Sequence, residues 1–132
     1  MTPKSPPRLL LALSNEDERE MYVTYLSAQG FDVVSLESAA GLATSLDIAP
    51  PDLIVIDTRL EGRVDSLEPV AVIRRRHGTR TIPVILITGN SGVALAEAAL
   101  AVGATESLLK PVYPEDLLYH VKRLLAAVSS HS

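Results

Sequence analysis

Three polar side chains stand directly behind short apolar runs of this sequence. Asp57 follows the run LIVI, Thr88 follows VILI, and Lys110 follows SLL. A carboxylate, a hydroxyl and an ammonium brought together could carry aspartyl-phosphate chemistry. The carboxylate attacks phosphorus, the lysine offsets phosphoryl charge, and the hydroxyl donates a hydrogen bond to a phosphoryl oxygen. Each residue alone is weak evidence, because a single acid behind a strand is more often a loop cap, but the three together indicate a site.

The apolar runs in front of these residues predict buried parallel strands. LIVI and VILI show no alternation of apolar and polar residues, which is typical of strands covered on both faces. Arg8–Leu13 and Phe31–Leu36 are two further predicted strands. In open parallel sheets, ligand chemistry sits at the carboxyl ends of the strands, which meet at one edge. We therefore expect Asp57, Thr88 and Lys110 to converge at that edge.

Five segments between and after the strands predict helices. Ser14 or Asn15 can cap the first, which we expect to carry Met21, Tyr25 and Leu26 inward. Five strands alternating with five helices, each connection long enough for a crossover, predict a three-layer α/β sandwich. The other helices are expected from Ser38 to about Leu46, from Ser66 to about His77, over Gly92–Val102, and from Pro114 with Leu117, Val121, Leu124 and Val128 on one stripe.

Composition restricts the class of protein. The 132 residues are 47% hydrophobic and 21% charged, which is a globular composition of one-domain size. The net charge of -4 argues against nucleic acid as a direct partner, and the absence of cysteine excludes disulfides and thiolate metal sites. No apolar run approaches the roughly 18 residues of a membrane span, and the proline-rich start is no signal peptide, so a cytoplasmic protein is the default expectation. We expect a flexible N-terminal arm over residues 1–7, one domain over 8–128, and a tail over 129–132.

Three motifs carry a resemblance to a known family. PDLIVIDTRLEG, IPVILITG and ESLLKP resemble the third, fourth and fifth strands of response-regulator receiver domains, the phosphorylated modules of two-component signalling. The resemblance covers about Arg8 to Val128 and implies a doubly wound (βα)5 sheet with strand order 2-1-3-4-5. It implies that Asp57 is the phosphoacceptor, Thr88 the switch hydroxyl and Lys110 the partner of the phosphoryl charge. It also implies a cis peptide bond between Lys110 and Pro111.

The sequence departs from this family where a metal would bind. Leu13 and Ser14 stand where two adjacent acids, together with the phosphoacceptor, normally hold Mg2+. Mg2+ requires oxygen ligands, so Leu13 cannot serve, and Ser14 could reach the ion only through water. Glu16 is a nearby acid that could swing in, but it lies in the wrong register for a direct substitution. Asp57 is left as a doubtful ligand, and we expect weak or altered Mg2+ dependence.

Two further positions differ from the family pattern. Ser107 replaces the usual aromatic residue that turns inward when the switch hydroxyl moves, and Glu61 occupies a loop position where proline is common. The loop from Glu61 to Ser66 is one residue longer than usual. Arg59 is either a solvated loop cation or a partial replacement for the missing metal charge near Asp57.

The segment Gly92–Val102 suggests a partner surface. Its sequence VALAEAALAV contains a single charge, Glu97, which is unusually apolar for a helix on the outside of a sheet. One interpretation is a docking or dimerisation surface to which Ser107, Leu108 and Tyr119 contribute. The other is a tightly packed alanine-rich helix, and the sequence does not distinguish them.

Three functions come into question for this sequence. The first is a stand-alone receiver that takes a phosphoryl group on Asp57 from a histidine kinase or phosphotransfer protein and signals in trans through protein contacts, without being an enzyme. The second is a phosphorylation-independent pseudo-receiver that acts as an interaction or dimerisation module. The third is a small enzyme on the same architecture, which the residues oppose. The segment SNED after the first strand is acidic and lacks the glycines of a flavin-phosphate loop, and Arg59 stands where a haloacid-dehalogenase-type phosphatase needs a second Asp. His77, His120 and His131 show no metal-ligand spacing.

Overall fold

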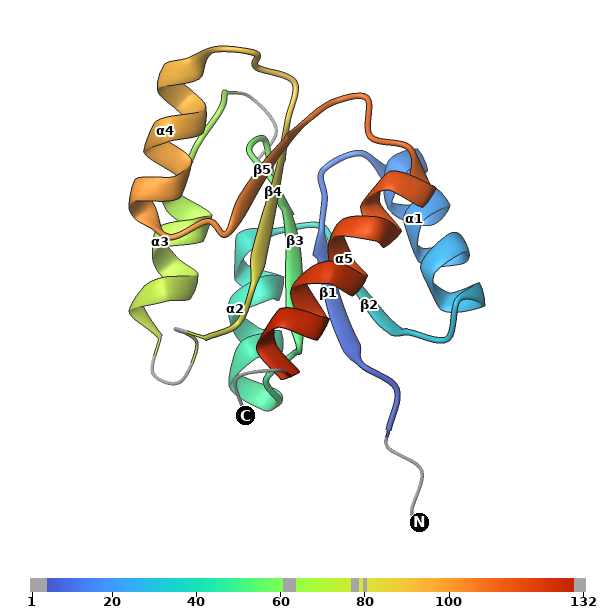
Figure 1. Ribbon diagram of the computed structural model, residues 1–132. Coiled ribbons are helices and arrows are strands. Elements are labelled where there is room, and N and C mark those ends of the chain that lie inside the picture. The colour runs from blue at the N-terminus through green and yellow to red at the C-terminus, as the bar shows by residue number, and fades with distance from the viewer. Residues whose placement is uncertain (1–4, 61–63, 77–78, 80, 130–132) are drawn as a thin grey trace.

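A central parallel sheet organises the molecule (Figure 1). The computed structural model describes residues 5–60, 64–76, 79 and 81–129. Neighbouring strands lie in the order β2-β1-β3-β4-β5, and every pairing is parallel. The strand order implied by the family resemblance is therefore confirmed. The strands are β1 (Arg8–Ala12), β2 (Asp32–Leu36), β3 (Leu53–Asp57), β4 (Val84–Thr88) and β5 (Glu106–Leu109).

Five helices cover the two faces of this sheet, as expected from the alternating pattern. They are α1 (Glu16–Ala28), α2 (Ala39–Ile48), α3 (Glu68–Arg75), α4 (Val93–Val102) and α5 (Pro114–Ser129). Side chains alternate along each strand, so Leu9 and Leu11 pack with α1 and α5, while Leu10 and Ala12 pack with α2, α3 and α4. Two apolar cores therefore lie on opposite sides of one sheet, which is a doubly wound arrangement.

Two of the central strands, β3 and β4, are buried along their whole length. All five residues of β3 and all five of β4 are buried, whereas the edge strands β2 and β5 consist of partly buried and exposed residues. The unbroken apolar runs of the sequence thus mark the strands with neighbours on both sides. Asp57 and Thr88 end these two strands and inherit their burial.

Asn15, and not Ser14, caps α1. The Oδ1 atom of Asn15 accepts a hydrogen bond of 2.9 Å from the backbone N–H of Glu18. Ser38 caps α2 as predicted, whereas Ser66 lies one position before the N-cap Leu67 of α3 and accepts from the N–H of Glu68. The predicted end of α3 at His77 lies outside the described residues, and the helix ends at Arg75. Because Asn15 is the cap, the hydroxyl of Ser14 is available elsewhere.

The inward face of α1 differs from the prediction by one residue. Met21 is 42% exposed, and Tyr22 is buried with Leu26, one turn further along the same face. Tyr25 is only partly buried. The Tyr22 hydroxyl donates a hydrogen bond of 2.5 Å to the carbonyl of Val112, which links α1 to the segment before α5. Burial, and then the negative charge of Glu18, raise the pKa of Tyr22 to about 12.

The apolar stripe of α5 is shorter than predicted. Leu117, Val121 and Leu124 enter the core, but Val128 is 43% exposed. Leu124 is the last buried residue of the helix in this core, and Leu125 packs against the core partly buried. α5 continues to Ser129, one residue beyond the domain limit expected at Val128. No helix in the described ranges is long and apolar enough to cross a bilayer.

Candidate functional site

The carboxylate of Asp57 is the centre of the site. Its side chain is 1% exposed at the end of β3, and both of its oxygens receive hydrogen bonds. The Ser14 hydroxyl donates to Oδ2 at 3.2 Å, and the Lys110 ammonium donates to the same oxygen at 3.1 Å. The backbone N–H of Arg59 donates to Oδ1 at 2.9 Å. Three donors thus stabilise a carboxylate that would otherwise be costly to bury.

Lys110 binds two acids at once. Its Nζ atom lies 3.1 Å from Asp57 Oδ2 and 3.2 Å from Glu18 Oε2. Partial burial of Lys110 opposes its protonation, but hydrogen bonding and charge attraction from Asp57, and then from Glu18, outweigh this and raise the pKa of the ammonium. Its backbone N–H donates to the carbonyl of Thr88, and the Lys110–Pro111 bond is cis, as the resemblance implied. Lys110 is therefore a fixed positive charge beside Asp57.

The residues around Asp57 do not fit a Mg2+ ion. Leu13 is fully buried and packs in the core with Tyr22 and Leu117, so it is a structural residue. Ser14 donates its hydroxyl hydrogen to Asp57, and the Arg19 guanidinium donates to the carbonyl of Leu13 at 2.7 Å. Among the described residues, no group of three His, Cys, Asp or Glu side chains is placed to hold a metal. A hard dication that prefers several oxygen ligands would compete with these donors for the Asp57 carboxylate, and the acid that α1 contributes, Glu18, is paired with Lys110.

The acid of α1 that reaches the site is Glu18 and not Glu16. Glu16 is exposed, while Glu18 lies one half-turn further along the helix and contacts the Lys110 ammonium. Glu18 is one of three acids in the first turn of α1, with Glu16 and Asp17. Its role depends on the direction in which α1 leaves the sheet, which no local pattern reports.

Thr88 is close to Asp57 in the sheet but hydrogen-bonds elsewhere. It lies one residue beyond Ile87, the partner of Asp57 in the β3–β4 register. In the described part of the chain, its Oγ1 atom contacts the hydroxyl of Thr58 at 3.3 Å and accepts from the N–H of Asn90 at 3.0 Å. The structure therefore joins Asp57 directly to Lys110, whereas the Thr88 hydroxyl belongs to a neighbouring network.

Asp65 is the acceptor of that neighbouring network. Its Oδ1 atom accepts from the Thr58 hydroxyl at 2.8 Å, and its Oδ2 atom accepts from the side-chain amide of Asn90 at 3.2 Å. The hydrogen bond from Thr58, then that from Asn90 and the nearby Arg59 charge, lower the pKa of Asp65 despite a partial opposing effect of burial. Neither Thr58 nor Asp65 was a candidate from the sequence, because no local pattern reports a contact between these two residues, seven positions apart.

The contacts of Arg59 distinguish its two interpretations, a solvated loop cation and a partial replacement for metal charge. Its guanidinium is 60% exposed and pairs with Asp65 at 3.5 Å, and only its backbone N–H reaches Asp57. The side chain is therefore a loop cation and not a substitute for metal charge at Asp57. Ser107 lies partly buried in β5 opposite Leu86, without the family's usual aromatic ring, and Glu61 lies outside the described residues.

Comparison with known proteins identifies the family. The profile of the response regulator receiver domain matches residues 10–122. The phosphate regulon transcriptional regulatory protein PhoB of Klebsiella pneumoniae is 29% identical over 92% of this chain and 53% of its own length. The transcriptional regulatory protein GltR of Pseudomonas aeruginosa is 32% identical over 89% of this chain and 48% of its own. The chain belongs to the response-regulator receiver family and spans about half the length of these curated relatives.

The solved structures agree with this assignment. A putative response regulator from Chloroflexus aurantiacus superposes with a TM-score of 0.83 at 27% identity, covering 92% of this chain and 98% of that one. The two proteins therefore share the receiver fold over nearly the whole of both chains. Receiver domains usually bind Mg2+ at their phosphorylation site, so the donor set around Asp57 is a departure within the family.

Proposed function

We propose that this receiver accepts a phosphoryl group on Asp57 and passes the signal on through protein contacts. The observation that carries the proposal is the hydrogen bond of 3.1 Å between the Lys110 ammonium and Asp57 Oδ2. In the transfer, a carboxylate oxygen of Asp57 forms a bond to phosphorus while the bond from phosphorus to the donor imidazole nitrogen breaks. A histidine kinase or a phosphotransfer protein, the donors of two-component signalling, would supply that phosphohistidine.

The residues of the chain supply charge compensation at this site. Lys110 neutralises negative charge on the incoming group, and the Ser14 hydroxyl and Arg59 N–H bind the acceptor carboxylate at 3.2 Å and 2.9 Å. Glu18 also contacts the Lys110 ammonium at 3.2 Å, so an incoming phosphoryl group shares this cation with a second acid. We assign no step to a metal ion, because Leu13 and Ser14 do not provide its ligands.

The test of this proposal is phosphoryl transfer from phosphoramidate, a small phosphorus–nitrogen donor, followed by intact-mass spectrometry. We expect the wild-type protein to gain one phosphoryl group and Asp57→Asn to gain none. Two-dimensional NMR with beryllofluoride, with and without Mg2+, provides a second readout at Asp57, Thr88 and Lys110. A protein that remains unmodified and shows the same spectrum under all these conditions would contradict the proposal.

A second candidate function is a phosphorylation-independent interaction module, and the surface of α4, β5 and α5 favours it. Of the ten residues of α4, all described, only Ala99 is buried. The tightly packed interpretation of this helix is therefore wrong. We call the exposed apolar residues on these elements the α4–β5–α5 face. Its members are Val93, Leu100, Val102, Leu109, Tyr119 and Val128.

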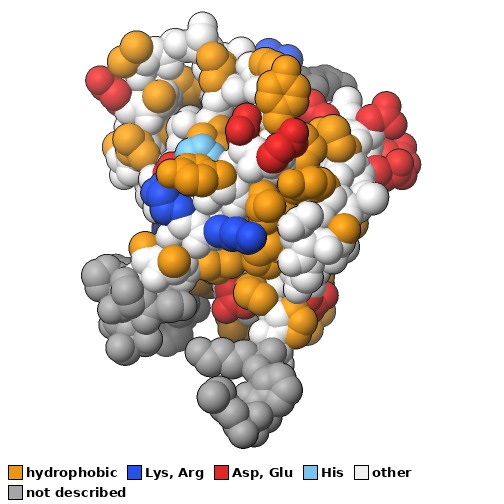
Figure 2. Space-filling view, turned by 45° about the vertical axis from the view of Figure 1, so that its right-hand side comes forward, with side chains coloured by type: hydrophobic (Ala, Val, Ile, Leu, Met, Phe, Trp, Pro, Cys, Tyr) orange, Lys and Arg blue, Asp and Glu red, His pale blue; other side chains and the backbone are white. Residues whose placement is uncertain are grey.

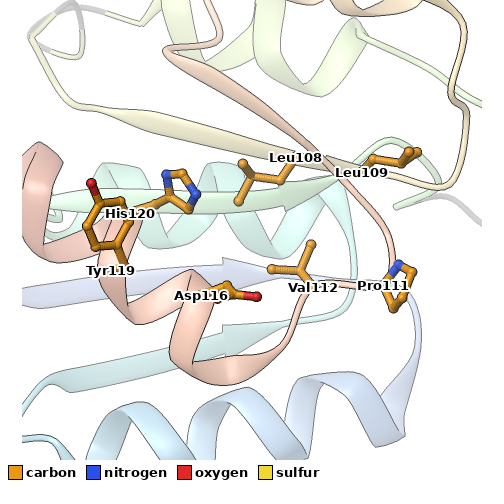
Figure 3. A pocket seen from close by; sticks show the side chains of 7 residues that line it. All are labelled: Leu108, Leu109, Pro111, Val112, Asp116, Tyr119 and His120. Atoms are coloured by element: carbon orange, nitrogen blue, oxygen red, sulfur yellow. The ribbon is translucent and has the colours of Figure 1, made fainter.

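This face combines apolar area with a shallow pocket. Figure 2 shows hydrophobic side chains around α5, interrupted by single charged groups and a histidine. A pocket of about 230 Å³ opens between β5 and α5 (Figure 3). On its α5 side, Tyr119 and His120 meet edge to face, and Arg123 lies 5.9 Å from the Tyr119 ring. The pocket is lined by Leu108, Leu109, Pro111, Val112, Asp116, Tyr119 and His120.

Sedimentation distinguishes an interaction module from a monomeric phosphoacceptor. Leu100 is 54% exposed, so Leu100→Glu places a charge on the α4–β5–α5 face without removing core volume. If the chain self-associates through this face, we expect the variant to be monomeric at concentrations where the wild type is not. Met21→Glu on the exposed side of α1 is the matched control. An oligomer that survives Leu100→Glu with an intact fold excludes this surface.

A further inference from the structure

The number of hydroxyl hydrogens determines the direction of the network behind Asp57. Thr58 has one hydroxyl hydrogen and lies 2.8 Å from Asp65 Oδ1 and 3.3 Å from Thr88 Oγ1. An ionised carboxylate only accepts, so the Thr58 hydrogen goes to Asp65. The contact between the two threonines then has one remaining donor, which is the hydroxyl of Thr88.

The same count leaves Thr88 without a hydrogen for Asp57. Its single hydroxyl hydrogen points to Thr58, and it accepts from the N–H of Asn90 at 3.0 Å. Both threonines are buried, at 1% and 3% exposure, so water does not offer Thr88 an alternative partner. To donate to a phosphoryl oxygen on Asp57, Thr88 must first give up its hydrogen bond to Thr58.

We propose that Asp65 is a positioning residue that, through the hydroxyl of Thr58, holds the Thr88 hydroxyl away from the acceptor carboxylate in the unphosphorylated protein. The chain of contacts is Asp65 Oδ1, Thr58 Oγ1, Thr88 Oγ1, and each link lies within hydrogen-bond distance. This inference rests on the proposed phosphoacceptor role of Asp57. It adds a residue from the loop after β3 to the control of the switch.

We call the hydrogen bonds from Thr88 to Thr58 and from Thr58 to Asp65 the relay, and the charge of Asp65 supports their direction. Hydrogen bonds from Thr58 and Asn90, with the Arg59 cation at 3.5 Å, lower the pKa of Asp65. The acid is therefore ionised at neutral pH and acts only as an acceptor, which is the condition that turns both hydroxyls toward it. A hydrogen bond to a charged group is stronger than one between neutral hydroxyls, so the Thr58–Asp65 link dominates the Thr58–Thr88 link.

A simpler role for Asp65 is to tether two loops. Its contacts with Thr58 and with the side chain of Asn90 join the loop after β3 to the loop after β4. A tether and a relay differ in what happens at Thr88. Asn90→Ala breaks the tether and leaves both hydroxyl links in place, whereas Thr58→Val breaks the relay and leaves the Asn90 link in place.

The χ1 rotamer of Thr88, measured by three-bond NMR couplings to its methyl carbon, tests the relay without any phosphoryl donor. We expect one rotamer in the wild type, averaging in Thr58→Val and Asp65→Ala, and a return to one rotamer in Thr58→Ser. Asn90→Ala and Thr105→Val are expected to match the wild type. Thr105 lies just before β5 and accepts from the N–H of Val84, at the opposite end of β4 from the site. Unchanged Thr88 couplings in both Thr58→Val and Asp65→Ala would overturn the proposal.

Beryllofluoride affinity separates this inference from the proposed function. If the relay restrains Thr88 by one hydrogen bond, its removal in Thr58→Val tightens binding about fivefold, and Thr58→Ser restores the wild-type affinity. A wild-type protein with no Asp57-dependent response contradicts phosphoacceptance, while the couplings still decide the relay. A responsive wild type with identical affinity in Thr58→Val contradicts the relay alone.

Discussion

The carboxylate of Glu18 on α1 lies 3.2 Å from the ammonium of Lys110, the residue that follows β5. Asp57 binds the same ammonium at 3.1 Å, so one lysine serves two acids. In this family two acids after the first strand usually serve a metal ion. Here the position nearest the strand is the core residue Leu13, and the acid contributed by α1 contacts the lysine. The positive charge beside Asp57 is thus the ammonium of Lys110, a side chain of the protein itself.

Removal of the Glu18 charge is expected to have opposite effects on stability and on phosphoryl binding. Glu18 and Lys110 are about one-third exposed, so Glu18→Gln costs only about 0.5 kcal/mol of unfolding free energy. The same change removes a negative charge that competes with the phosphoryl group for Lys110, and we expect beryllofluoride to bind about threefold more tightly. Urea unfolding and an NMR titration measure the two effects. Glu20→Gln, at an exposed acid of the same helix, is the control, and a weaker affinity in Glu18→Gln would contradict the competition.

Loss of the lysine is expected to destabilise the buried acid. Lys110→Met leaves the Asp57 carboxylate, 1% exposed, without its cationic partner and lowers the unfolding free energy by about 1–3 kcal/mol. Asp57→Asn in the same chain removes the unpaired charge, so the double variant recovers part of that loss. A double-mutant cycle by chemical unfolding measures the coupling. Additive losses from the two substitutions would show that the pair does not interact.

The sequence predicted the features that depend on local patterns and missed the contacts that do not. The buried strands, their order through the family resemblance, and the contact between Asp57 and Lys110 were predictable, because apolar runs and strand ends are local features. Ser14 was predicted only as a cap or a remote ligand, whereas it binds Asp57 directly. Thr58 and Asp65 were not predicted at all. Their contact joins two residues seven positions apart, and no periodic pattern in the sequence reports it.

Asp65 is expected to give the protein a specific acid sensitivity. The pKa of Asp65 is lowered in the folded protein from its ordinary value of 3.8, mainly by the hydrogen bond from Thr58. A lowered folded pKa means that the stabilisation is present above pH 3.8 and is lost as the pH falls through the folded value. Asp65→Asn is therefore less stable than the wild type at pH 7, and the difference shrinks at about pH 3.

Urea unfolding at the two pH values measures this difference, with Asp32→Asn at an exposed position of β2 as the matched control. The prediction concerns how the unfolding free energy changes as the pH is lowered, and not its value at pH 7. A gap between wild type and Asp65→Asn that stays constant down to the lower pH would contradict the assignment of the ionised acceptor.

The hydrogen bond of Tyr22 is expected to contribute to the position of the segment before α5. Tyr22→Phe removes the hydroxyl that donates to the Val112 carbonyl at 2.5 Å and leaves that buried carbonyl without this partner. We expect a loss of about 1–3 kcal/mol in unfolding free energy, measured by urea denaturation. Tyr25→Phe, on the partly buried side of the same helix, is the control. Equal small losses in both variants would show that the hydroxyl of Tyr22 has no special role.

A second carboxylate at position 14 is expected to convert the site into a metal site. In Ser14→Asp a new negative charge replaces the hydroxyl that donates to Asp57 at 3.2 Å, so like charges face each other and the protein loses stability in metal-free buffer. Mg2+ relieves the repulsion and binds only the folded state, so the Tm of Ser14→Asp rises with Mg2+ concentration. The wild type, with one occupied carboxylate, shows no such rise. Thermal unfolding across a Mg2+ series measures both, with Ser14→Asn as the neutral control. A wild-type Tm that climbs with Mg2+ as steeply as that of Ser14→Asp would mean that Asp57 holds the ion without the second acid.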